Sequence, residues 1–128
     1  MLKECDFVVV TAPLTPLTKG LIGEEELKAM KPGSFLVHIS RGGVVDEKAL
    51  LQALTDKHLA GAAVDVFAQE PLPHDHPLWK VPNLILTPHV SGFSPHYKER
   101  AGIMFAENLK RYLRGEPLLN DYQPERYY

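Results

Sequence analysis

Short apolar runs alternate with helix-like segments along most of the chain, and this alternation limits the possible folds more than any other feature. The runs have the branched and aromatic residues of buried strands and cover residues 6–13, 34–40, 60–67 and 83–89. Between the first three runs, helical patterns occupy residues 24–30 and 46–59, and Asp46 is placed to cap the second helix. Strands that alternate with helices are typical of parallel β-α-β units, so we expect an α/β fold with a parallel sheet of about four strands and crossover helices.

The last predicted element is longer than the others. Ser94 and Pro95 supply an N-cap and a first-turn proline, and the helical pattern then continues to Arg114. A helix over residues 95–114 is roughly 30 Å long, and its broad apolar face must pack against another surface. We therefore expect the chain to divide into an α/β part, residues 1–93, and a long C-terminal helix with its tail, residues 94–128.

Composition and charge narrow the class of protein. The chain has 128 residues, which is enough for one domain with a hydrophobic core. A formal net charge of −2 gives no support for a nucleic-acid partner or an anionic membrane surface. The single cysteine, Cys5, excludes an intrachain disulfide framework and fits a reducing compartment. No apolar stretch has the length of a signal peptide or a membrane span, so we expect a cytoplasmic protein without nucleic-acid or membrane partners.

Four polar residues follow the predicted strands. Arg41 comes after the second strand, and His89 ends the fourth. Asp65 and Glu70 lie at or just after the end of the third strand. Because the carboxyl ends of parallel strands share one edge, where open α/β sheets bind their ligands, we expect these four residues to converge there.

These residue types suit an anionic substrate that undergoes proton transfer. A guanidinium such as that of Arg41 clamps carboxylates and phosphates, and a histidine exchanges protons near neutral pH. A glutamate beside the histidine would fix its tautomer. Other interpretations remain open: Arg41 as a surface ion pair, His89 as a capped loop histidine, Glu70 as a solvated carboxylate, and Asp65 as a strand-end cap.

The pair His74 and His76 raises the possibility of a metal site. Both lie in a proline-rich loop, and no third or fourth ligand follows at a familiar spacing. We therefore predict that the chain has no metal site and that both histidines face solvent.

Four segments, in order, resemble the motifs of the D-isomer-specific 2-hydroxyacid dehydrogenase family. "KPGSFLVHISRGGVVDE" is similar to the arginine signature, "GAAVDVFAQEPLP" to the glutamate motif and "LILTPHVSG" to the histidine motif of that family. The opening "CDFVVVTAPLTPLTKGLIG" is similar to a cofactor-loop segment, and the resemblance extends from about residue 4 to about residue 120. It implies half of a Rossmann-like NAD-binding domain, followed by a long helix that would pack on a substrate domain or a partner chain.

The resemblance also implies a reaction, a reversible hydride transfer between NAD or NADP and the carbonyl carbon of a 2-oxo acid. Arg41 would hold the substrate carboxylate, His89 would protonate the carbonyl oxygen, and Glu70 would hydrogen-bond His89. Asp65 matches a residue that contacts the nicotinamide carboxamide. The residues that match cofactor-lining positions are Ala12, Pro13, Thr18, Ile39, Ser40, Arg41, Asp65, His89, Ser91 and Gly92.

The sequence departs from the family pattern in two ways. Family members often carry asparagine at the position of His38, to which we assign no catalytic role. In addition, no G-x-G-x-x-G loop is present, and neither is the acidic residue that follows it and binds the adenosine ribose. We therefore expect a fragment with an incomplete cofactor site, inactive by itself, in which NAD cannot be distinguished from NADP and the 2-hydroxy acid cannot be identified.

Two functional hypotheses follow. In the first, the chain supplies the catalytic residues of an NAD(P)-dependent D-2-hydroxyacid dehydrogenase. In the second, it is a non-catalytic structural or interaction module. In either case, simple right-handed crossovers would leave one sheet edge and one sheet face uncovered, so we expect self-association through the sheet edge and the C-terminal helix, or coverage of the sheet by residues 95–114.

Overall fold

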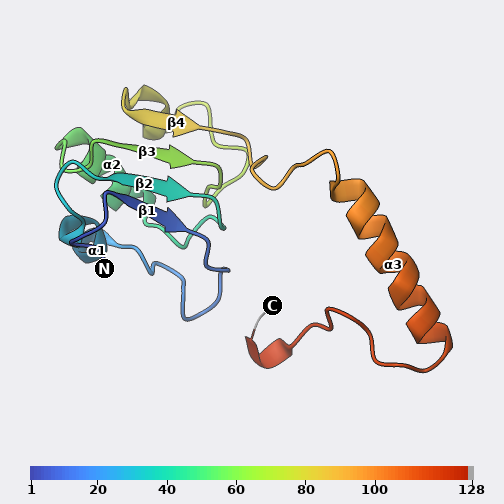
Figure 1. The fold of residues 1–128 in the computed structure, drawn as a ribbon. Helices are drawn as coiled ribbons and strands as arrows, with labels where there is room; N and C mark the ends of the chain where they lie inside the picture. The colour runs from blue at the N-terminus through green and yellow to red at the C-terminus, as the bar shows by residue number, and fades with distance from the viewer. Residues whose placement is uncertain (127–128) are drawn as a thin grey trace. The chain divides into compact units, whose positions relative to one another are not determined.

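The computed structural model describes residues 1–126, which fall into two compact units that divide between Ser91 and Gly92. Figure 1 shows the four strands of the first unit side by side. They form a parallel sheet in the order β1-β2-β3-β4, which confirms the predicted α/β fold. The elements of the first unit are β1 (Phe7–Val10), α1 (Glu24–Ala29), β2 (Phe35–His38), α2 (Glu47–Thr55), β3 (Gly61–Val64), the 3-10 helix η1 (Pro77–Lys80) and β4 (Leu84–Leu86).

The register of the sheet determines where the functional residues lie. The last residues of the four strands form one row across the sheet, in which Val10 pairs with His38, His38 with Val64, and Val64 with Leu86. The segments that leave these four residues therefore emerge at one edge, which we call the carboxyl rim. The functional side chains predicted from the sequence lie on these segments.

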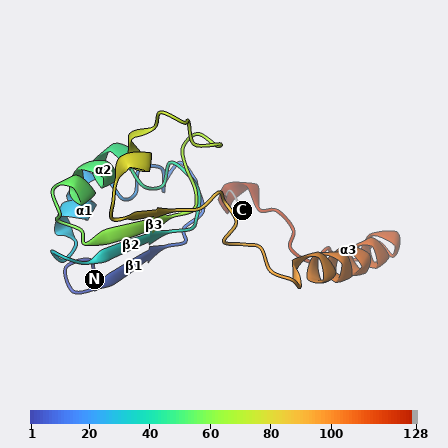
Figure 2. The same cartoon turned by 90° about the horizontal axis from the view of Figure 1, so that it is seen from above.

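The helices lie on one face of the sheet, as Figure 2 shows for α1 and α2. The inward-facing strand residues Val8, Leu36 and Val64 are at most 8% exposed and pack with Leu27 of α1 and Leu50 of α2. Burial of side chains of this size stabilises the unit by about 1.5–3 kcal/mol each.

The predicted N-cap of α2 is confirmed. Oδ1 of Asp46 accepts hydrogen bonds from the backbone amides of Lys48 and Ala49, in the first turn of the helix.

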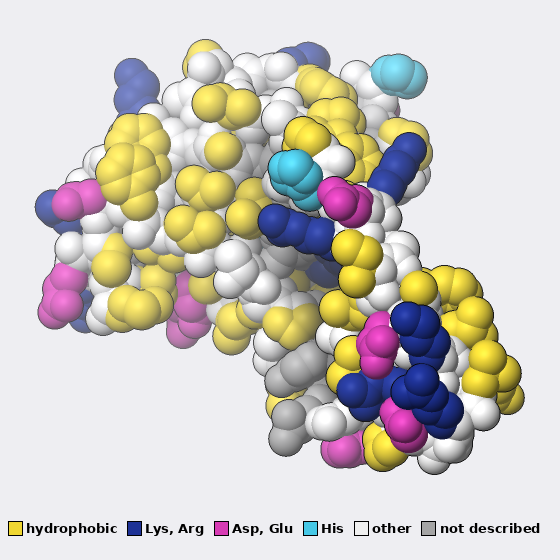
Figure 3. Space-filling view, turned by 45° about the vertical axis from the view of Figure 1, so that its right-hand side comes forward, with side chains coloured by type: hydrophobic (Ala, Val, Ile, Leu, Met, Phe, Trp, Pro, Cys, Tyr) yellow, Lys and Arg dark blue, Asp and Glu magenta, His cyan; other side chains and the backbone are white. Residues whose placement is uncertain are grey.

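No element of the first unit covers the opposite face of the sheet. Phe7, Val9 and Ile85 point to this side and are 64%, 55% and 66% exposed. Phe7 stacks on Phe35 of the next strand with ring centroids 5.2 Å apart, so the face has an aromatic surface. Hydrophobic side chains are visible on the outside of the first unit in Figure 3. We call this surface, made by Phe7, Val9, Phe35 and Ile85, the open sheet face.

The strands are shorter than the predicted runs. Each predicted strand extended into the carboxyl rim, where the backbone leaves the sheet. For example, the amide of Phe67, in the predicted run 60–67, donates to the side chain of Glu70 rather than to a neighbouring strand. The apolar composition of a run predicts that the run is buried, but it does not predict the residue at which the backbone stops pairing with the neighbouring strand.

The second unit contains a long helix, α3 (Tyr97–Leu113), and a short 3-10 helix, η2 (Pro124–Arg126). The predicted start was wrong: α3 begins two residues later, with His96 as the N-cap, and the side chain of His96 makes no capping hydrogen bond. Asn108 binds both backbone groups of Leu119, which folds the following segment back along the helix. The use of α3 as a surface for a substrate domain or partner chain stays a prediction.

Within residues 1–126, no helix is both long enough and apolar enough to cross a membrane.

Candidate functional site

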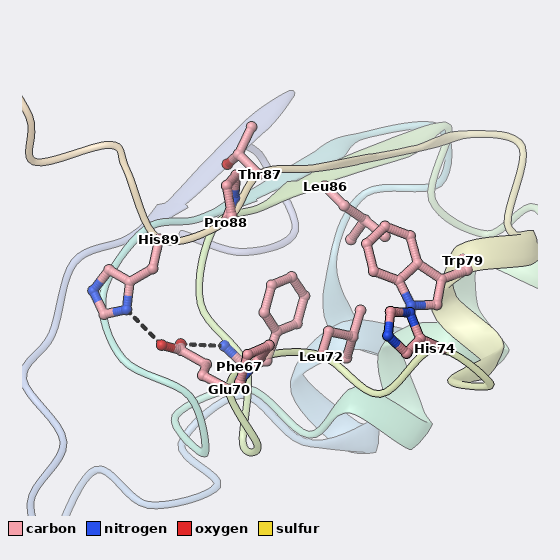
Figure 4. Close-up of a pocket in the computed structure, with 10 residues that line it drawn as sticks. Phe67, Glu70, Leu72, His74, Trp79, Leu86, Thr87, Pro88 and His89 are labelled. Carbon is pink, nitrogen blue, oxygen red and sulfur yellow. Dashed lines mark hydrogen bonds and ion pairs between the residues drawn. The ribbon is translucent and has the colours of Figure 1, made fainter.

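Glu70 and His89 pair with each other at the carboxyl rim. Oε2 of Glu70 lies 2.7 Å from Nδ1 of His89, and its other oxygen, Oε1, accepts a hydrogen bond of 2.9 Å from the backbone amide of Phe67. Figure 4 shows both bonds as dashed lines. Because a carboxylate only accepts hydrogen bonds, Nδ1 carries the ring proton, which leaves Nε2 as the atom that can exchange a proton with a ligand.

Arg41 lies on the free side of the same imidazole. Its Nη1 atom is 3.4 Å from Nε2 of His89 and donates a hydrogen bond of 2.8 Å to the carbonyl oxygen of Ser40. The structure therefore places Glu70, His89 and Arg41 in a row, with the imidazole between a carboxylate and a guanidinium. This row joins three segments that lie far apart in the sequence, as the parallel sheet predicts.

Gly42 explains how the turn that carries Arg41 approaches the glutamate segment. A Cβ atom at Gly42 would lie 1.8 Å from the carbonyl oxygen of Phe67, a distance that no side chain permits. The backbone of the arginine turn thus packs directly on Phe67, whose amide binds Glu70. The next residue, Gly43, has a φ of 86°, a left-handed conformation that glycine adopts without strain.

The environment of Glu70 favours its ionised form. The hydrogen bond from His89 is the largest cause, and it lowers the pKa of Glu70 below its ordinary value. The Phe67 amide and the positive charge of Arg41 act in the same direction, while burial opposes them. Glu70 is therefore a carboxylate acceptor for His89 throughout the neutral pH range.

Asp65 differs from Glu70 in its position and partners. It is only 2% exposed, and its Oδ1 accepts hydrogen bonds from the Thr87 hydroxyl at 2.5 Å and from the Val90 amide at 2.9 Å. Oδ2 accepts from the Ser91 amide at 2.8 Å. Burial by itself raises the pKa of Asp65, but the hydrogen bonds from Ser91, Thr87 and Val90 outweigh it and hold the pKa well below its usual range.

His89 has an uncommon backbone conformation. Its φ is 56°, in the left-handed region, which costs a residue other than glycine on the order of 1–2 kcal/mol. The surrounding hydrogen bonds to Asp65 offset this cost. A strained backbone at a candidate catalytic residue, held by its neighbours, is typical of functional sites.

A pocket of about 670 Å³ lies on the Glu70 side of the imidazole. Its lining is mainly apolar, and Figure 4 shows Phe67, Leu72, Trp79 and Leu86 around it. His74, which borders this pocket, is exposed as predicted. The prediction is wrong for His76, whose side chain is only 25% exposed because it accepts a hydrogen bond from the Leu78 amide and lies 3.6 Å from Glu47. Within residues 1–126, no three side chains of the metal-binding types gather in one place.

Five predicted cofactor residues lie on the segments that follow β1 and β2. Ala12 and Pro13 are in the loop after β1, where Thr18 closes the loop by donating a hydrogen bond of 2.5 Å to the Pro13 carbonyl. Ile39 is 39% exposed at the rim, whereas Ser40 is 6% exposed and lies 3.4 Å from Nδ1 of His38. Small and apolar groups of this kind suit the nicotinamide end of a dinucleotide, and their contact with a cofactor stays a prediction. The phosphate-binding glycine loop has no counterpart in the sequence.

Two further predicted cofactor residues follow His89. The Ser91 amide binds Asp65, so the backbone of Ser91 belongs to the rim. Gly92 begins the second unit, and its contact with a cofactor stays a prediction.

His38 is buried below the rim. It is 3% exposed, and its Nε2 atom has no partner among the described residues. Burial lowers the pKa of His38, which keeps the ring neutral.

Sequence reasoning missed two residues that shape the site. Thr87 binds Asp65, and Glu47, in the first turn of α2, accepts a hydrogen bond of 2.6 Å from the Ala68 amide and so fixes the segment before Glu70. The position of Thr87, two residues before His89, was the available signal. Nothing in the sequence marks Glu47, because an acidic residue in the first turn of a helix is common.

Comparisons with known proteins show what the chain is similar to. Residues 1–91 match the family model described as D-isomer specific 2-hydroxyacid dehydrogenase, NAD binding domain. A glyoxylate reductase of Korarchaeum cryptofilum is 49% identical over 116 residues, which cover 91% of this chain and 35% of that protein. A D-3-phosphoglycerate dehydrogenase of Methanocaldococcus jannaschii is 43% identical over 114 residues, which cover 89% of this chain and 22% of that protein.

A solved structure is similar over nearly the whole chain. It is a D-isomer specific 2-hydroxyacid dehydrogenase from Xanthobacter autotrophicus Py2 in complex with NADPH and MES, with a TM-score of 0.92 and 42% identity, and the match covers 99% of this chain and 52% of that one. The chain spans about a third or less of the two curated relatives. The predicted family and its NAD(P) cofactor class are confirmed, and the chain belongs to the D-isomer specific 2-hydroxyacid dehydrogenase family, with residues 1–91 matching its NAD-binding domain.

Proposed function

We propose that the chain supplies the catalytic residues of an NAD(P)-dependent oxidoreductase that interconverts a small 2-hydroxy acid and the corresponding 2-oxo acid. The observation that supports this most directly is the row of Glu70, His89 and Arg41 at one rim of the sheet. The names of relatives, glyoxylate reductase and glyoxylate/hydroxypyruvate reductase, support a small 2-oxo acid as substrate.

Each residue of the row has a separate task. Arg41, the exposed cation of the rim, binds the substrate carboxylate and orients the neighbouring carbonyl group. In its doubly protonated form, His89 gives the proton on Nε2 to the carbonyl oxygen during reduction and becomes neutral; in oxidation the neutral ring takes the proton of the hydroxyl group on Nε2. Glu70 binds Nδ1 and thereby keeps Nε2 as the atom that faces the ligand.

The cofactor would lie beside this row. Ala12, Pro13 and Ile39 would form the apolar surface under the nicotinamide, and Ser91 and Gly92 would flank it. The nicotinamide supplies or accepts the hydride when it is bound. The remaining steps, which are carboxylate binding, orientation and proton transfer, belong to side chains of this chain.

An exchange of segments tests the proposal. The aligned residues of the Korarchaeum cryptofilum glyoxylate reductase are replaced by those of this chain, and oxidation of NADH and NADPH is followed with glyoxylate, hydroxypyruvate and pyruvate. We expect the chimera to reduce at least one of these acids, and His89→Asn to lower kcat by about 10²-fold or more. His96→Asn is the matched control, because His96 is exposed and lies outside the row. A chimera that is active but indifferent to His89→Asn contradicts the proposal.

The 128-residue chain itself is assayed under the same conditions. We expect it to be inactive, since it has no glycine-rich phosphate loop. Turnover by this chain alone would contradict the expectation that its cofactor site is incomplete. A chimera that folds and binds cofactor but reduces no 2-oxo acid would favour the alternative, a non-catalytic structural or interaction module.

The open sheet face supports a second proposal, on partners. We infer that copies of the chain associate through this face, because no element of the first unit covers its aromatic and branched side chains. Strand β1 is also unpaired on its outer side within the described residues, which adds a row of free backbone groups at this end of the sheet.

A further inference from the structure

Asp65 has an arrangement of partners that a cofactor contact does not require. Three donors reach its carboxylate, and all three belong to the segment that carries His89: the Thr87 hydroxyl, the Val90 amide and the Ser91 amide. The donors lie on both sides of His89 in the sequence. Asp65 itself follows β3 directly, so it is anchored in the sheet.

Both carboxylate oxygens of Asp65 are engaged. Oδ1 accepts two of the hydrogen bonds and Oδ2 accepts the third. The residue is 2% exposed, whereas the side chains of Glu70 and His89 are 35% and 39% exposed. A ligand at the rim can therefore reach Glu70 and His89 far more readily than Asp65.

The conformation of His89 requires such an anchor. Its backbone is left-handed, a conformation that histidine keeps only where the surroundings hold it. The Val90 and Ser91 amides follow this residue directly, so their hydrogen bonds to Asp65 fix the direction in which the chain leaves it. Glu70 binds the ring of His89 but not its backbone.

We propose that Asp65 is a positioning residue, whose buried carboxylate holds the 87–91 turn so that the imidazole of His89 stays between Glu70 and Arg41. The catalytic meaning of this role rests on the proposed function, but the structural role does not. Two carboxylates from the connection between β3 and β4 then hold His89. Asp65 fixes its backbone, and Glu70 fixes its ring. This differs from the role implied by the family resemblance, in which Asp65 contacts the nicotinamide carboxamide.

The substitution Asp65→Asn tests the proposal in the 128-residue chain. An asparagine has one acceptor oxygen and an NH₂ group, so it cannot accept hydrogen bonds on both sides as the carboxylate does. We expect amide exchange at Val90 and Ser91 to become about tenfold faster or more, as follows from the loss of charge-assisted hydrogen bonds. We also expect the nitrogen NMR signals of His89 to show a mixture of the two ring tautomers in place of the single form protonated on Nδ1.

A matched control separates positioning from general stability. Asp46→Ala removes another carboxylate that accepts two backbone amides, at the start of α2 and outside the site. We expect it to lower the melting temperature while the exchange at Val90 and the tautomer of His89 stay as in the wild type. Equal effects of Asp65→Asn and Asp46→Ala on His89 would overturn the proposal, as would an unchanged tautomer in Asp65→Asn.

A milder variant keeps the test decisive if Asp65→Asn does not fold. Thr87→Val removes one of the three hydrogen bonds and leaves both amide bonds in place. We expect a smaller increase in exchange at Val90 and a partial change in the His89 tautomer, and no change in either would overturn the proposal.

The catalytic consequence is measured in the chimera. Asp65→Asn should lower kcat with the KM for NADH within about twofold of the parent, because positioning acts on the reacting group rather than on cofactor affinity. An effect confined to the KM for NADH would overturn the positioning role and support the carboxamide contact. If the chimera is inactive, the proposed function fails, while the exchange and tautomer measurements still decide the role of Asp65.

Discussion

Nδ1 of His89 lies 2.7 Å from Oε2 of Glu70, while Nε2 of the same ring lies 3.4 Å from Nη1 of Arg41. The imidazole is thus bound on one side by a group that only accepts hydrogen bonds and faces, on the other, a group that only donates them. This arrangement fixes the tautomer from both sides. A carboxylate bound at Arg41, as we propose for the substrate, would lie next to Nε2 of His89.

Glu70→Gln should therefore impair catalysis more than stability. A glutamine amide can donate to Nδ1 as well as accept from it, so the other ring tautomer becomes available. We expect kcat in the chimera to fall by about 10²-fold or more, with a melting temperature close to that of the parent, because Glu70 is partly exposed. Glu25→Gln, an exposed change in α1, should leave kcat unchanged. Retention of kcat in Glu70→Gln would show that the tautomer does not limit the reaction.

Arg41→Lys should separate charge from geometry. Lysine keeps the positive charge but loses the planar pair of donors that matches a carboxylate. We expect kcat/KM for glyoxylate in the chimera to fall by about tenfold or more, mainly through a higher KM. Lys57→Met, two residues after the end of α2, is the control for a lost or altered surface cation. A fall in kcat with an unchanged KM would assign Arg41 to the transition state rather than to substrate binding.

The residues of the row could be predicted from the sequence because a parallel sheet gathers its strand ends. The row of Val10, His38, Val64 and Leu86 across the sheet brings Arg41, which follows β2, close to His89, which follows β4. This convergence depends only on strand order and direction, which the alternation of strands and helices indicates.

Other features could not be predicted, for physical reasons. The burial of Asp65 depends on three donors from a segment that is 22 to 26 residues away, and no local pattern indicates such a contact. The start of α3 was misplaced because Ser94 and Pro95 have the usual residue types of a helix start, but Tyr97 is the first helical residue. The helix preferences of single residues determine only weakly where a helix begins, and α3 begins just after the connection between the two units.

Gly42→Ala should destabilise the first unit strongly. The added Cβ would lie 1.8 Å from the Phe67 carbonyl oxygen, which is backbone and cannot move aside alone. We expect a loss of at least about 3 kcal/mol in the free energy of unfolding, at the upper end of overpacking effects, measured by urea denaturation. Gly102→Ala is the matched control, since no atom outside the backbone of its own helix lies within 4 Å of its added Cβ and alanine favours α3 by about 1 kcal/mol. A Gly42→Ala protein as stable as the parent would contradict the close approach of the arginine turn.

Ile85→Lys should weaken self-association. Ile85 is 66% exposed on the open sheet face, and a charge there is costly to bury between two copies. We expect sedimentation equilibrium to show dimers or larger species for the parent chain and a shift towards monomer for the variant. Leu17→Lys, at a residue that is 88% exposed in the loop after β1, should leave the parent association unchanged. A monomeric parent chain at high concentration would contradict association through this face.

Acid should destabilise the first unit through Asp65. Its pKa is lowered because the hydrogen bonds from Ser91, Thr87 and Val90 outweigh the effect of burial. A carboxyl group with a lowered folded-state pKa stabilises the fold fully above its unfolded pKa of about 3.9, and this stability is lost as the pH falls towards the folded value. We expect the free energy of unfolding to fall below about pH 4, with a slope for one group of at most about 1.4 kcal/mol per pH unit. Urea denaturation between pH 7 and pH 3 should show the steepest fall in the parent, a smaller one in Thr87→Val and the smallest in Asp65→Asn, and equal slopes in all three would rule out Asp65 as a source of the acid sensitivity.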